Sequence, residues 1–279
     1  MNVTIVTVAT HDSGYFKILQ ESCKKNKSTI KILGYGQKWE GLGTKIKFMK
    51  EYLSSIKNTN EIVAFVDAYD VIMIGSSEEL LERYLSFNKP IVFGIESKRS
   101  WLKWTIEKYY YGLYLKEIIN TGTYMGRVSE LLQLLDSITI YNKNDQILIN
   151  ESVQKNKEWF NSNCILDTNS ILFHNAACDS FLGHLHLKFC NIGLEYIDGK
   201  LIDSNGIQPV FLHGPGCIDI SSYVRKLGYN ADPPNIKEYS SFILKEYSES
   251  FMYGILIIIF VIISIVVLLR IYNHWFKHS

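Results

Sequence analysis

Two aspartates stand where an apolar segment ends, and their spacing suits a metal ion. The uncharged run Ile62–Val66 predicts a buried strand, Asp67 and Asp70 follow it, and a second apolar stretch begins at Val71. Burying two carboxylates among apolar residues is costly unless a partner binds them. A hard divalent cation, held by one or two carboxylates together with substrate phosphates, is such a partner. The alternative is a turn in which the acids accept backbone N–H groups.

Histidines and cysteines later in the chain offer a second possible metal site. They lie close together in the sequence, at His174, Cys178, His184, His186 and Cys190. These residue types bind zinc, but their spacing fits no compact zinc motif. Buried structural cysteines and hydrogen-bonded histidines are therefore favoured over zinc. The chain also has no GxGxxG or GxxxxGK[ST] loop, so a dinucleotide or P-loop site is not indicated.

The elements that must position Asp67 and Asp70 alternate between strand and helix. Strands are predicted at Val3–Ala9, Thr29–Leu33, Glu61–Val66 and Pro90–Phe93, and helices at Gly14–Lys25, Thr44–Ile56 and Glu78–Phe87. Ser76 or Ser77 can cap the last of these helices. The alternation predicts an α/β fold with a mostly parallel sheet covered on both faces. Ligands of such sheets bind outside the carboxyl ends of the strands, which is where the two aspartates are expected.

Composition and charge exclude several classes of protein. The 279 residues contain 29 Lys+Arg and 28 Asp+Glu, for a net charge of +1, whereas a nucleic-acid binder usually carries a concentrated basic excess. A hydrophobic fraction of 47% with 20% charged residues indicates a globular chain. Five cysteines without a C-x-x-C pair argue against a disulfide framework and fit a reducing compartment.

The C-terminal segment predicts a single-pass membrane anchor. Residues 251–269 carry no charge and are interrupted only by Gly254 and Ser264. At about 1.5 Å of rise per residue this run spans about 28 Å, close to the hydrocarbon thickness of a bilayer. A buried core helix, the alternative, rarely lacks a polar face over such a length. We expect an α/β domain at 1–234, a juxtamembrane linker at 235–250, a transmembrane helix at 251–271 and a short polar tail at 272–279.

The orientation of this anchor is less sharply indicated. The N-terminus lacks the basic start and apolar run of a signal peptide, so we expect insertion after synthesis and a cytosolic N-terminal domain. The positive-inside rule favours the lumenal side instead, because Arg270 and Lys277 follow the span. Glycosylation sequons at Asn2, Asn26 and Asn150 would matter only in a secretory lumen. The lumenal side stays open as the alternative.

Several motifs in a fixed order carry a family resemblance. They are TVAT at 7–10, ILGYGQKW at 32–39, GTKIKFMK at 43–50, DAYD at 67–70, NTGTYMG at 120–126, DQ at 145–146 and PVFLHGPG at 209–216. This series resembles the glycosyltransferase domain of the procollagen lysyl hydroxylase (PLOD) family, without its hydroxylase domains. The resemblance covers residues 3 to 217 and implies a Rossmann-like GT-A glycosyltransferase fold.

The resemblance implies a metal site and an acceptor side. The family's metal motif and late histidine correspond to Asp67, Asp70 and His213, which would hold Mn²⁺. Its acceptor-side residues correspond to Asn120 and Asp145. Asp145 can act as a general base on an acceptor hydroxyl or stabilise positive charge on the sugar. The plainer interpretations are a turn residue for Asn120 and a helix-starting acid for Asp145.

The resemblance also implies a nucleotide-sugar site. Tyr69 and Trp39 correspond to the residues that contact the base and ribose, and Lys45 to the lysine that approaches the diphosphate. Gly214 and Gly216 would let the backbone approach the phosphates closely. Against these roles, Trp39 can be a surface-capping aromatic and Lys45 an ordinary solvated helix charge.

The expected function is Mn²⁺-dependent transfer of glucose or galactose from a UDP-sugar. The acceptor would be hydroxylysine or galactosylhydroxylysine of a collagen-like protein. Two departures weaken the match: Lys143 and Asn144 stand where the family often has acids, and Cys217 begins a segment where it usually has a lysine. The alternatives are an inactive nucleotide-sugar-binding membrane scaffold and a transferase acting on a membrane-associated glycan or lipid.

Overall fold

A six-stranded sheet forms the centre of the N-terminal unit, Met1–Asn235. The computed structural model describes residues 3–96, 117–139, 141, 143–176, 193–216, 218–233 and 248–277. The strand order is β2-β1-β3-β6-β5-β7. The strands are β1 Val3–Val8, β2 Ile30–Leu33, β3 Ile62–Val66, β5 Ile91–Ile95, β6 Ile119–Arg127 and β7 Cys164–Leu166. Neighbours are parallel except at β6, which is antiparallel to both β3 and β5. The expected α/β fold with a mostly parallel sheet is confirmed.

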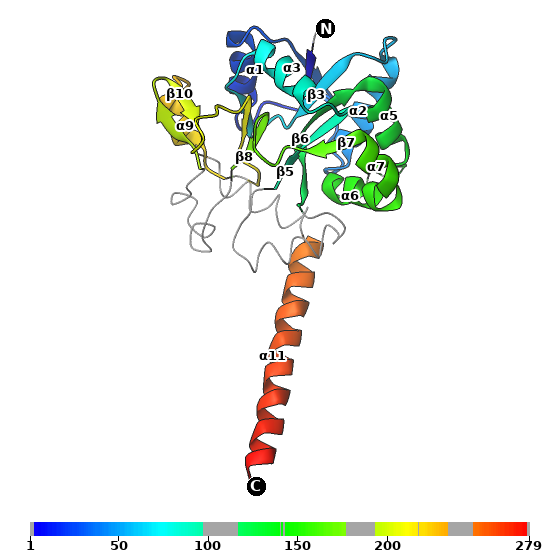
Figure 1. Ribbon diagram of the computed structural model, residues 1–279, viewed down its shortest axis with the longest axis vertical. Coiled ribbons are helices and arrows are strands. Elements are labelled where there is room, and N and C mark those ends of the chain that lie inside the picture. Colours follow the sequence, from blue (N-terminus) through cyan, green and yellow to red (C-terminus); the bar gives the residue numbers. More distant parts are fainter. Residues whose placement is uncertain are drawn as a thin grey trace. The chain divides into compact units, whose positions relative to one another are not determined.

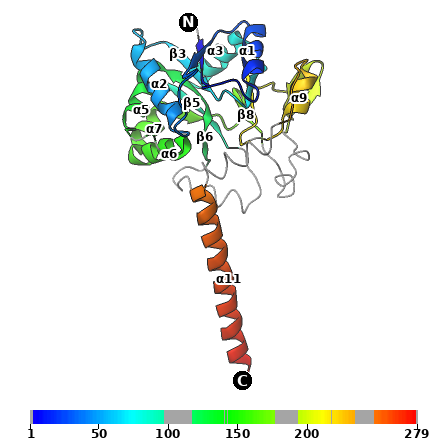
Figure 2. The same ribbon diagram turned by 180° about the vertical axis from the view of Figure 1, so that it is seen from behind.

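Helices cover both faces of this sheet because its strands bury alternate side chains on opposite sides. They are α1 Phe16–Lys25, α2 Thr44–Ser55, α3 Ser77–Ser86, α5 Val128–Asp136, α6 Asp145–Lys155 and α7 Lys157–Asn163. In β3, Val63 and Phe65 join a core with α2, α5, α6 and α7, whereas Ala64 and Val66 join a core with α1 and α3. Figures 1 and 2 show these two groups of helices on opposite sides of the sheet.

A second, three-stranded sheet brings distant segments of the chain together. Its order is β4-β11-β8, with β4 at Val71–Met73, β11 at Phe211–His213 and β8 at Phe173–Asn175. The register sets His213 beside Val71 on one side and beside Asn175 on the other. Since β4 begins directly after Asp70, strand pairing carries His213 to the end of the aspartate segment. A hairpin of β9 Glu195–Ile197 and β10 Lys200–Ile202, and the helix α9 Ser221–Lys226, complete the described elements of this unit.

Local sequence signals explain where several elements begin and end. Ser76 caps α3 by accepting the backbone N–H of Glu79, whose side chain accepts the N–H of Ser76 in return. The strand expected at Pro90–Phe93 runs instead from Ile91 to Ile95. β6 was not among the strands predicted from the sequence, although eight of its nine residues are buried. Its glycines and threonines resemble a turn, and burial between β3 and β5 overrides that preference.

The structure places two of the three sequons. Asn150 is buried on α6, and its side-chain amide donates to the carbonyl of Gln146. Asn26 follows α1, and its amide donates to the carbonyls of Ser22 and Met73. Both amides are therefore engaged within the folded domain, while Asn2 lies outside the described residues.

The second unit, Ile236–Ser279, contains a thirty-residue helix, α11, at Ser248–Lys277. Its segment Ile255–Asn273 has a mean hydropathy of 3.1, and none of the searched window is buried. By length and composition it is the one helix in the described part of the chain that can cross a membrane. This finding agrees with the predicted anchor without defining its topology.

The capping box of α3 gives a first prediction. Ser76→Ala should destabilise the chain by about 1 kcal/mol, because the N–H of Glu79 loses its acceptor. Thermal unfolding of the full chain in detergent measures this loss. Ser77→Ala, one residue further on, is the matched control and should leave the unfolding temperature nearly unchanged. Equal effects of the two substitutions would contradict the assignment of the cap.

Candidate functional site

Backbone hydrogen bonds hold both aspartates at the carboxyl end of β3. The N–H of Asp67 donates to the carbonyl of Gly122 in β6, at 2.8 Å. The carbonyl of Asp70 accepts the N–H of Gly214, also at 2.8 Å. The aspartate segment is thus tied to the central sheet at one end and to the segment after β11 at the other.

Asp67, Asp70 and His213 converge on one point. Each offers a ligand atom, and the three atoms lie within 4.8 Å of one another. His213 is buried, whereas the two aspartates are half-buried and so accessible to a ligand. Two carboxylates and one imidazole form a donor set that Mn²⁺ accepts. The residues present therefore fit a divalent cation, although no ion defines its identity.

Gly122 keeps this point open. A Cβ built at Gly122 would lie 2.5 Å from Cε1 of His213 and 2.6 Å from Oδ2 of Asp67. Any side chain at this position of β6 would therefore collide with two of the three candidate ligand residues. Contacts within the site thus explain why the NTG segment has a glycine at position 122.

The charges around His213 favour a cation there. Burial lowers the pKa of His213, but the carboxylates of Asp70, Asp67 and Glu96 outweigh burial and raise its pKa above the ordinary value. Its Nε2 lies 3.4 Å from Oδ1 of Asp70. In the described part of the chain this Nε2 makes no hydrogen bond of normal geometry. A proton or a metal ion can satisfy the same nitrogen.

Lys45 joins the metal segment to the predicted acceptor side. Its Nζ lies 3.0 and 3.2 Å from the two carboxylate oxygens of Asp67, and 2.8 Å from Oδ2 of Asp145. Burial lowers the pKa of Lys45, but the two carboxylates outweigh burial and raise its pKa, so the amine stays charged at neutral pH. Lys45 is 7% exposed, which excludes an ordinary solvated helix charge.

Asp145 both starts a helix and faces the site. It is the first residue of α6, and the preceding Asn144 caps the helix by accepting the N–H of Gln146. Its Oδ2 accepts hydrogen bonds from Thr121 and Lys45, and the residue is 4% exposed. The approach of α2 to the loop before α6 is close, since a Cβ at Gly43 would collide with the carbonyls of Tyr141 and Lys143.

Asn120 belongs to a buried polar group that includes an acid not anticipated from the sequence. Its Nδ2 donates to Oε1 of Glu96 at 2.8 Å, and its Oδ1 accepts the N–H of Gly122 at 2.9 Å. Gln146 also donates to Oε1 of Glu96, at 3.3 Å. Glu96 follows β5 directly, and an acid at the carboxyl end of a predicted strand was the signal that could have identified it.

The two predicted base-contacting aromatics lie in different surroundings. The hydroxyl of Tyr69 accepts the backbone N–H groups of Thr10 and His11, beyond the end of β1. Trp39 packs against the core on the α2 side of the sheet. Its indole N–H is buried and has no hydrogen-bond acceptor within the described ranges.

The remaining predicted residues are only partly described. Gly214 is buried and gives its N–H to Asp70, so that amide is not free for a phosphate. Gly216 is exposed and has a φ of 65°, a left-handed conformation that favours glycine. Cys217 lies outside the described residues, as do Cys178, His184, His186 and Cys190 of the zinc alternative. His174 lies in β8.

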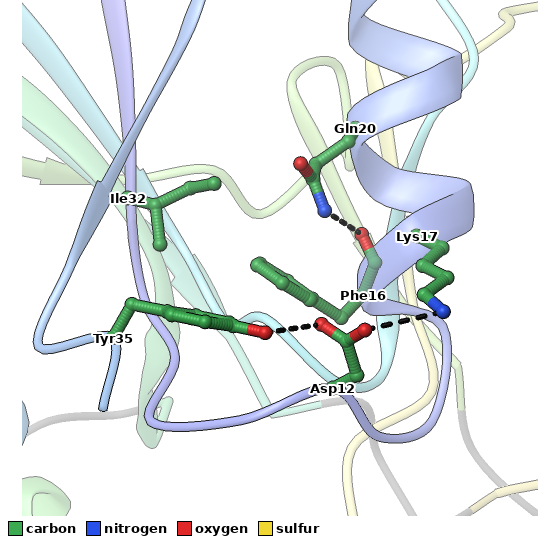
Figure 3. Close-up of a pocket in the computed structure, with 6 residues that line it drawn as sticks. All are labelled: Asp12, Phe16, Lys17, Gln20, Ile32 and Tyr35. Atoms are coloured by element: carbon green, nitrogen blue, oxygen red, sulfur yellow. Dashed lines mark hydrogen bonds and ion pairs between the residues drawn. The ribbon is translucent and has the colours of Figure 1, made fainter. Parts of the chain in front are cut away.

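A cavity of about 430 Å³ opens beside the carboxyl ends of β1 and β2. Figure 3 shows its lining residues, which are Asp12, Phe16, Lys17, Gln20, Ile32 and Tyr35. Asp12 accepts a hydrogen bond from Tyr35 and pairs with Lys17, and the Phe16 and Tyr35 rings are stacked. None of the predicted site residues lines the cavity. The ring of Tyr69 is edge-on to the ring of Phe16, with 6.4 Å between the ring centroids. The candidate functional site is the group of Asp67, Asp70 and His213, because these side chains can hold a metal ion.

Comparison with known proteins finds a family match over most of the chain. A family model described as the PLOD GT domain matches residues 1–226. The chain is 26% identical over 235 residues to the multifunctional procollagen lysine hydroxylase and glycosyltransferase of Caenorhabditis elegans, covering 77% of this chain and 30% of that protein. It is 29% identical over 142 residues to the Homo sapiens enzyme LH3 of the same name, covering 47% of this chain and 19% of that protein. The chain thus spans less than a third of the length of these relatives.

A solved glycosyltransferase involved in glycosylation of the major capsid of PBCV-1 is a more distant match. It is 10% identical, with 77% of this chain and 95% of that chain covered and a TM-score of 0.41. A likeness this low has no bearing on function.

The space at Gly122 gives a second prediction. Gly122→Ala should weaken Mn²⁺ binding at least about tenfold, because the added methyl group would displace His213 and Asp67. Titration of free Mn²⁺ by electron paramagnetic resonance measures the affinity. Gly126→Ala is the control in the same strand: its Cβ would meet the carbonyl of Pro90 at 2.8 Å, away from the ligands. Unchanged affinity in Gly122→Ala would contradict the assigned site.

The buried ion pairs of Lys45 give a third prediction. Lys45→Met should destabilise the metal-free chain by about 3 kcal/mol, because Asp67 and Asp145 lose their buried cation. Urea denaturation of the full chain in detergent measures the loss. Lys47→Met, on the same helix but without these contacts, should change the free energy of unfolding by less than about 0.5 kcal/mol. Equal losses would show that the ion pairs of Lys45 add nothing to the stability of the metal-free chain.

Proposed function

Because the chain belongs to the family of PLOD glycosyltransferase domains, we propose that it transfers glucose or galactose from a UDP-sugar with the help of Mn²⁺. The proposed acceptor is hydroxylysine or galactosylhydroxylysine of a collagen-like protein. The observation that carries the proposal is the convergence of Asp67, Asp70 and His213 around the space that Gly122 leaves open.

The metal ligands suit the departure of a diphosphate. Breaking the bond between the sugar and UDP leaves negative charge on phosphate oxygens, and a bound divalent cation supplies positive charge there. Asp67 and Asp70 would hold that cation through their carboxylates, and His213 through its free Nε2. His213 belongs to strand β11, and Asp67 and Asp70 lie in the four-residue segment between β3 and β4, so strands hold the site in place before substrate arrives.

Lys45 can contact both the leaving diphosphate and the acceptor-side residue Asp145. Its amine is charged and fixed between Asp67 and Asp145. A diphosphate bound near Asp67 would offer this amine a further anionic partner, because an ammonium group has three donors. Lys45 would then stabilise the leaving group while keeping Asp145 in its orientation.

Asp145 and Asn120 are the proposed acceptor-side residues. Oδ2 of Asp145 already accepts two hydrogen bonds, so Oδ1 is the oxygen left to receive an acceptor proton or to face positive charge on the sugar. Asn120 is fixed by Glu96 on one side and by the N–H of Gly122 on the other. We include Glu96 in the same group because it is the shared acceptor for Asn120 and Gln146.

Tyr69 and Trp39 are the proposed contacts for the nucleotide. The ring of Tyr69 stands next to the metal motif, and its hydroxyl is anchored at the end of β1. The indole N–H of Trp39 is a buried donor that makes no hydrogen bond to the described residues, and a polar atom of the nucleotide could accept it. Gly214 and Gly216 remain proposed phosphate neighbours, with Gly216 the more accessible of the two.

The membrane part of the proposal depends on α11. We propose that residues 251–271 anchor the chain, that 1–234 is the catalytic domain, and that 235–250 links them. The length of the Ile255–Asn273 segment and its mean hydropathy of 3.1 support an anchor. A cytosolic catalytic domain is the proposed orientation, with the lumenal side as its alternative. This same anchor favours, as a second candidate, a transferase whose acceptor is a membrane-associated glycan or lipid.

Donor turnover gives a fourth prediction. The full chain in detergent should release UDP from UDP-glucose or UDP-galactose when Mn²⁺ is present and not when it is chelated. Asp70→Asn should lower this rate at least about 100-fold, because a metal ligand is lost. Asp136→Asn removes an exposed carboxylate that pairs with Lys50 and should leave the rate unchanged.

The acceptor is tested with the same preparation. Mass spectrometry of a hydroxylated collagen peptide should show one added hexose, whereas transfer only to membrane lipid would favour the second candidate. Donor binding without release or transfer, unaffected by Asp70→Asn, would indicate an inactive scaffold instead.

A further inference from the structure

Asn175 lies behind the proposed metal site and contacts one of its ligands. It ends β8, and the parallel register of β8 with β11 pairs it directly with His213. Asn175 and His213 are each 2% exposed. Oδ1 of Asn175 lies 2.7 Å from Nδ1 of His213. Neither the family resemblance nor the sequence pattern predicted a role for Asn175.

The hydrogen bonds of Asn175 fix the direction of its amide. Its Nδ2 donates to the carbonyl of Ile95, at 2.8 Å. A carbonyl oxygen can only accept, so the NH₂ group must face Ile95 and the amide oxygen must face His213. Reversing the amide would place Oδ1 of Asn175 against the carbonyl oxygen of Ile95, and neither oxygen can donate a hydrogen bond.

The fixed amide in turn selects one form of the imidazole. An amide oxygen can only accept, so Nδ1 of His213 must carry the proton. In the neutral ring Nε2 is then unprotonated, with its lone pair available. That nitrogen lies 3.4 Å from Oδ1 of Asp70, so it is the one placed to bind a metal ion together with Asp70.

The sheet is shaped to allow this contact. The pairing of β5 with β6 shifts register between Phe93 and Gly94. A Cβ at Gly94 would lie 2.8 Å from Nδ2 of Asn175 and would collide with Oγ1 of Thr123. The glycine and the bulge thus make room for Asn175 to reach the carbonyl of Ile95.

We propose that Asn175 is a positioning residue that holds His213 in the Nδ1–H tautomer and thereby sets the affinity of the site for a divalent cation. The proposal rests on the metal site of the proposed function. It assigns Asn175 no contact with substrate. Partners that orient a metal-bound histidine through its other ring nitrogen typically change metal affinity 10–100-fold when they are removed.

Two substitutions separate this role from a structural one. Asn175→Leu removes both the contact with His213 and the contact with Ile95. Asn175→Asp keeps an oxygen acceptor for Nδ1–H of His213 but cannot, when ionised, donate to Ile95. If Asn175 only joined β8 to β5, the two variants would behave alike. Thr123→Val is the control, because Thr123 approaches the same amide at 3.4 and 3.5 Å without contacting His213.

The affinity of the full chain in detergent for Mn²⁺ alone is measured by electron paramagnetic resonance. Asn175→Leu should bind Mn²⁺ at least about tenfold more weakly than the unmodified chain, while Asn175→Asp and Thr123→Val stay within about threefold of it or bind more tightly. Unchanged affinity in Asn175→Leu, or equal losses in the Leu and Asp variants, would overturn the proposal. No Mn²⁺ binding by the unmodified chain would instead refute the metal site of the proposed function.

A second measurement does not depend on whether the Asn175 variants fold. In the metal-free unmodified chain with ¹³C-labelled histidine, the Cδ2 chemical shift of His213 at alkaline pH reports the tautomer of its neutral ring, with His213→Gln identifying the signal. The shift expected is that of the Nδ1–H form. The shift of the Nε2–H form would overturn the proposal even if Mn²⁺ binds.

Discussion

Several carboxylates lie close together where the strands of the central sheet end at their C-termini. The rest of this structure depends on that constraint. Asp67, Asp145 and Glu96 meet there from three different elements, and a low-dielectric environment makes uncompensated charge of one sign expensive. The ammonium group of Lys45 contacts the carboxylates of Asp67 and Asp145, and the side-chain amides of Asn120 and Gln146 donate hydrogen bonds to Glu96. Either a proton on Nε2 of His213 or a bound cation can offset the negative charge of Asp67 and Asp70 beside it. Near-neutral net charge is compatible with binding a diphosphate, because a cation held at these residues supplies the charge locally.

The two sheets divide the work of building the site. The central sheet fixes Asp67 through its bond to Gly122, and the small sheet delivers His213 and Asn175 through strand register. Glycines stand where backbone or ligand atoms approach closely: Gly122 beside the metal ligands and Gly94 beside Asn175. Glycine weakens the interior of a strand in general, and where it occurs there it often marks a bulge or the close approach of a ligand or another segment.

Much of the first ninety residues could be predicted from periodicity, because each strand there is a short apolar run between polar helices. The Asp67–Asp70 pair could be recognised as a site from its position after Ile62–Val66, whereas His213 required the family resemblance. Strand β6 could not be identified, because its threonines and glycines resemble a turn until its neighbours bury them. Asn175, Glu96 and the partners of Lys45 depend on register between segments far apart in sequence, which no local pattern encodes. The roles assigned to Tyr69, Trp39, Gly214 and Gly216 remain predictions.

The central claim is that Asp67, Asp70 and His213 together hold a divalent cation used in glycosyl transfer. The most direct measurement is the anomalous diffraction signal at the manganese absorption edge, from crystals of the chain grown with Mn²⁺ and a UDP-sugar. The account predicts a peak bonded to both aspartate carboxylates and to Nε2 of His213, beside the diphosphate. A bound UDP-sugar with no manganese peak at these three residues, or with its peak on other side chains, would contradict it.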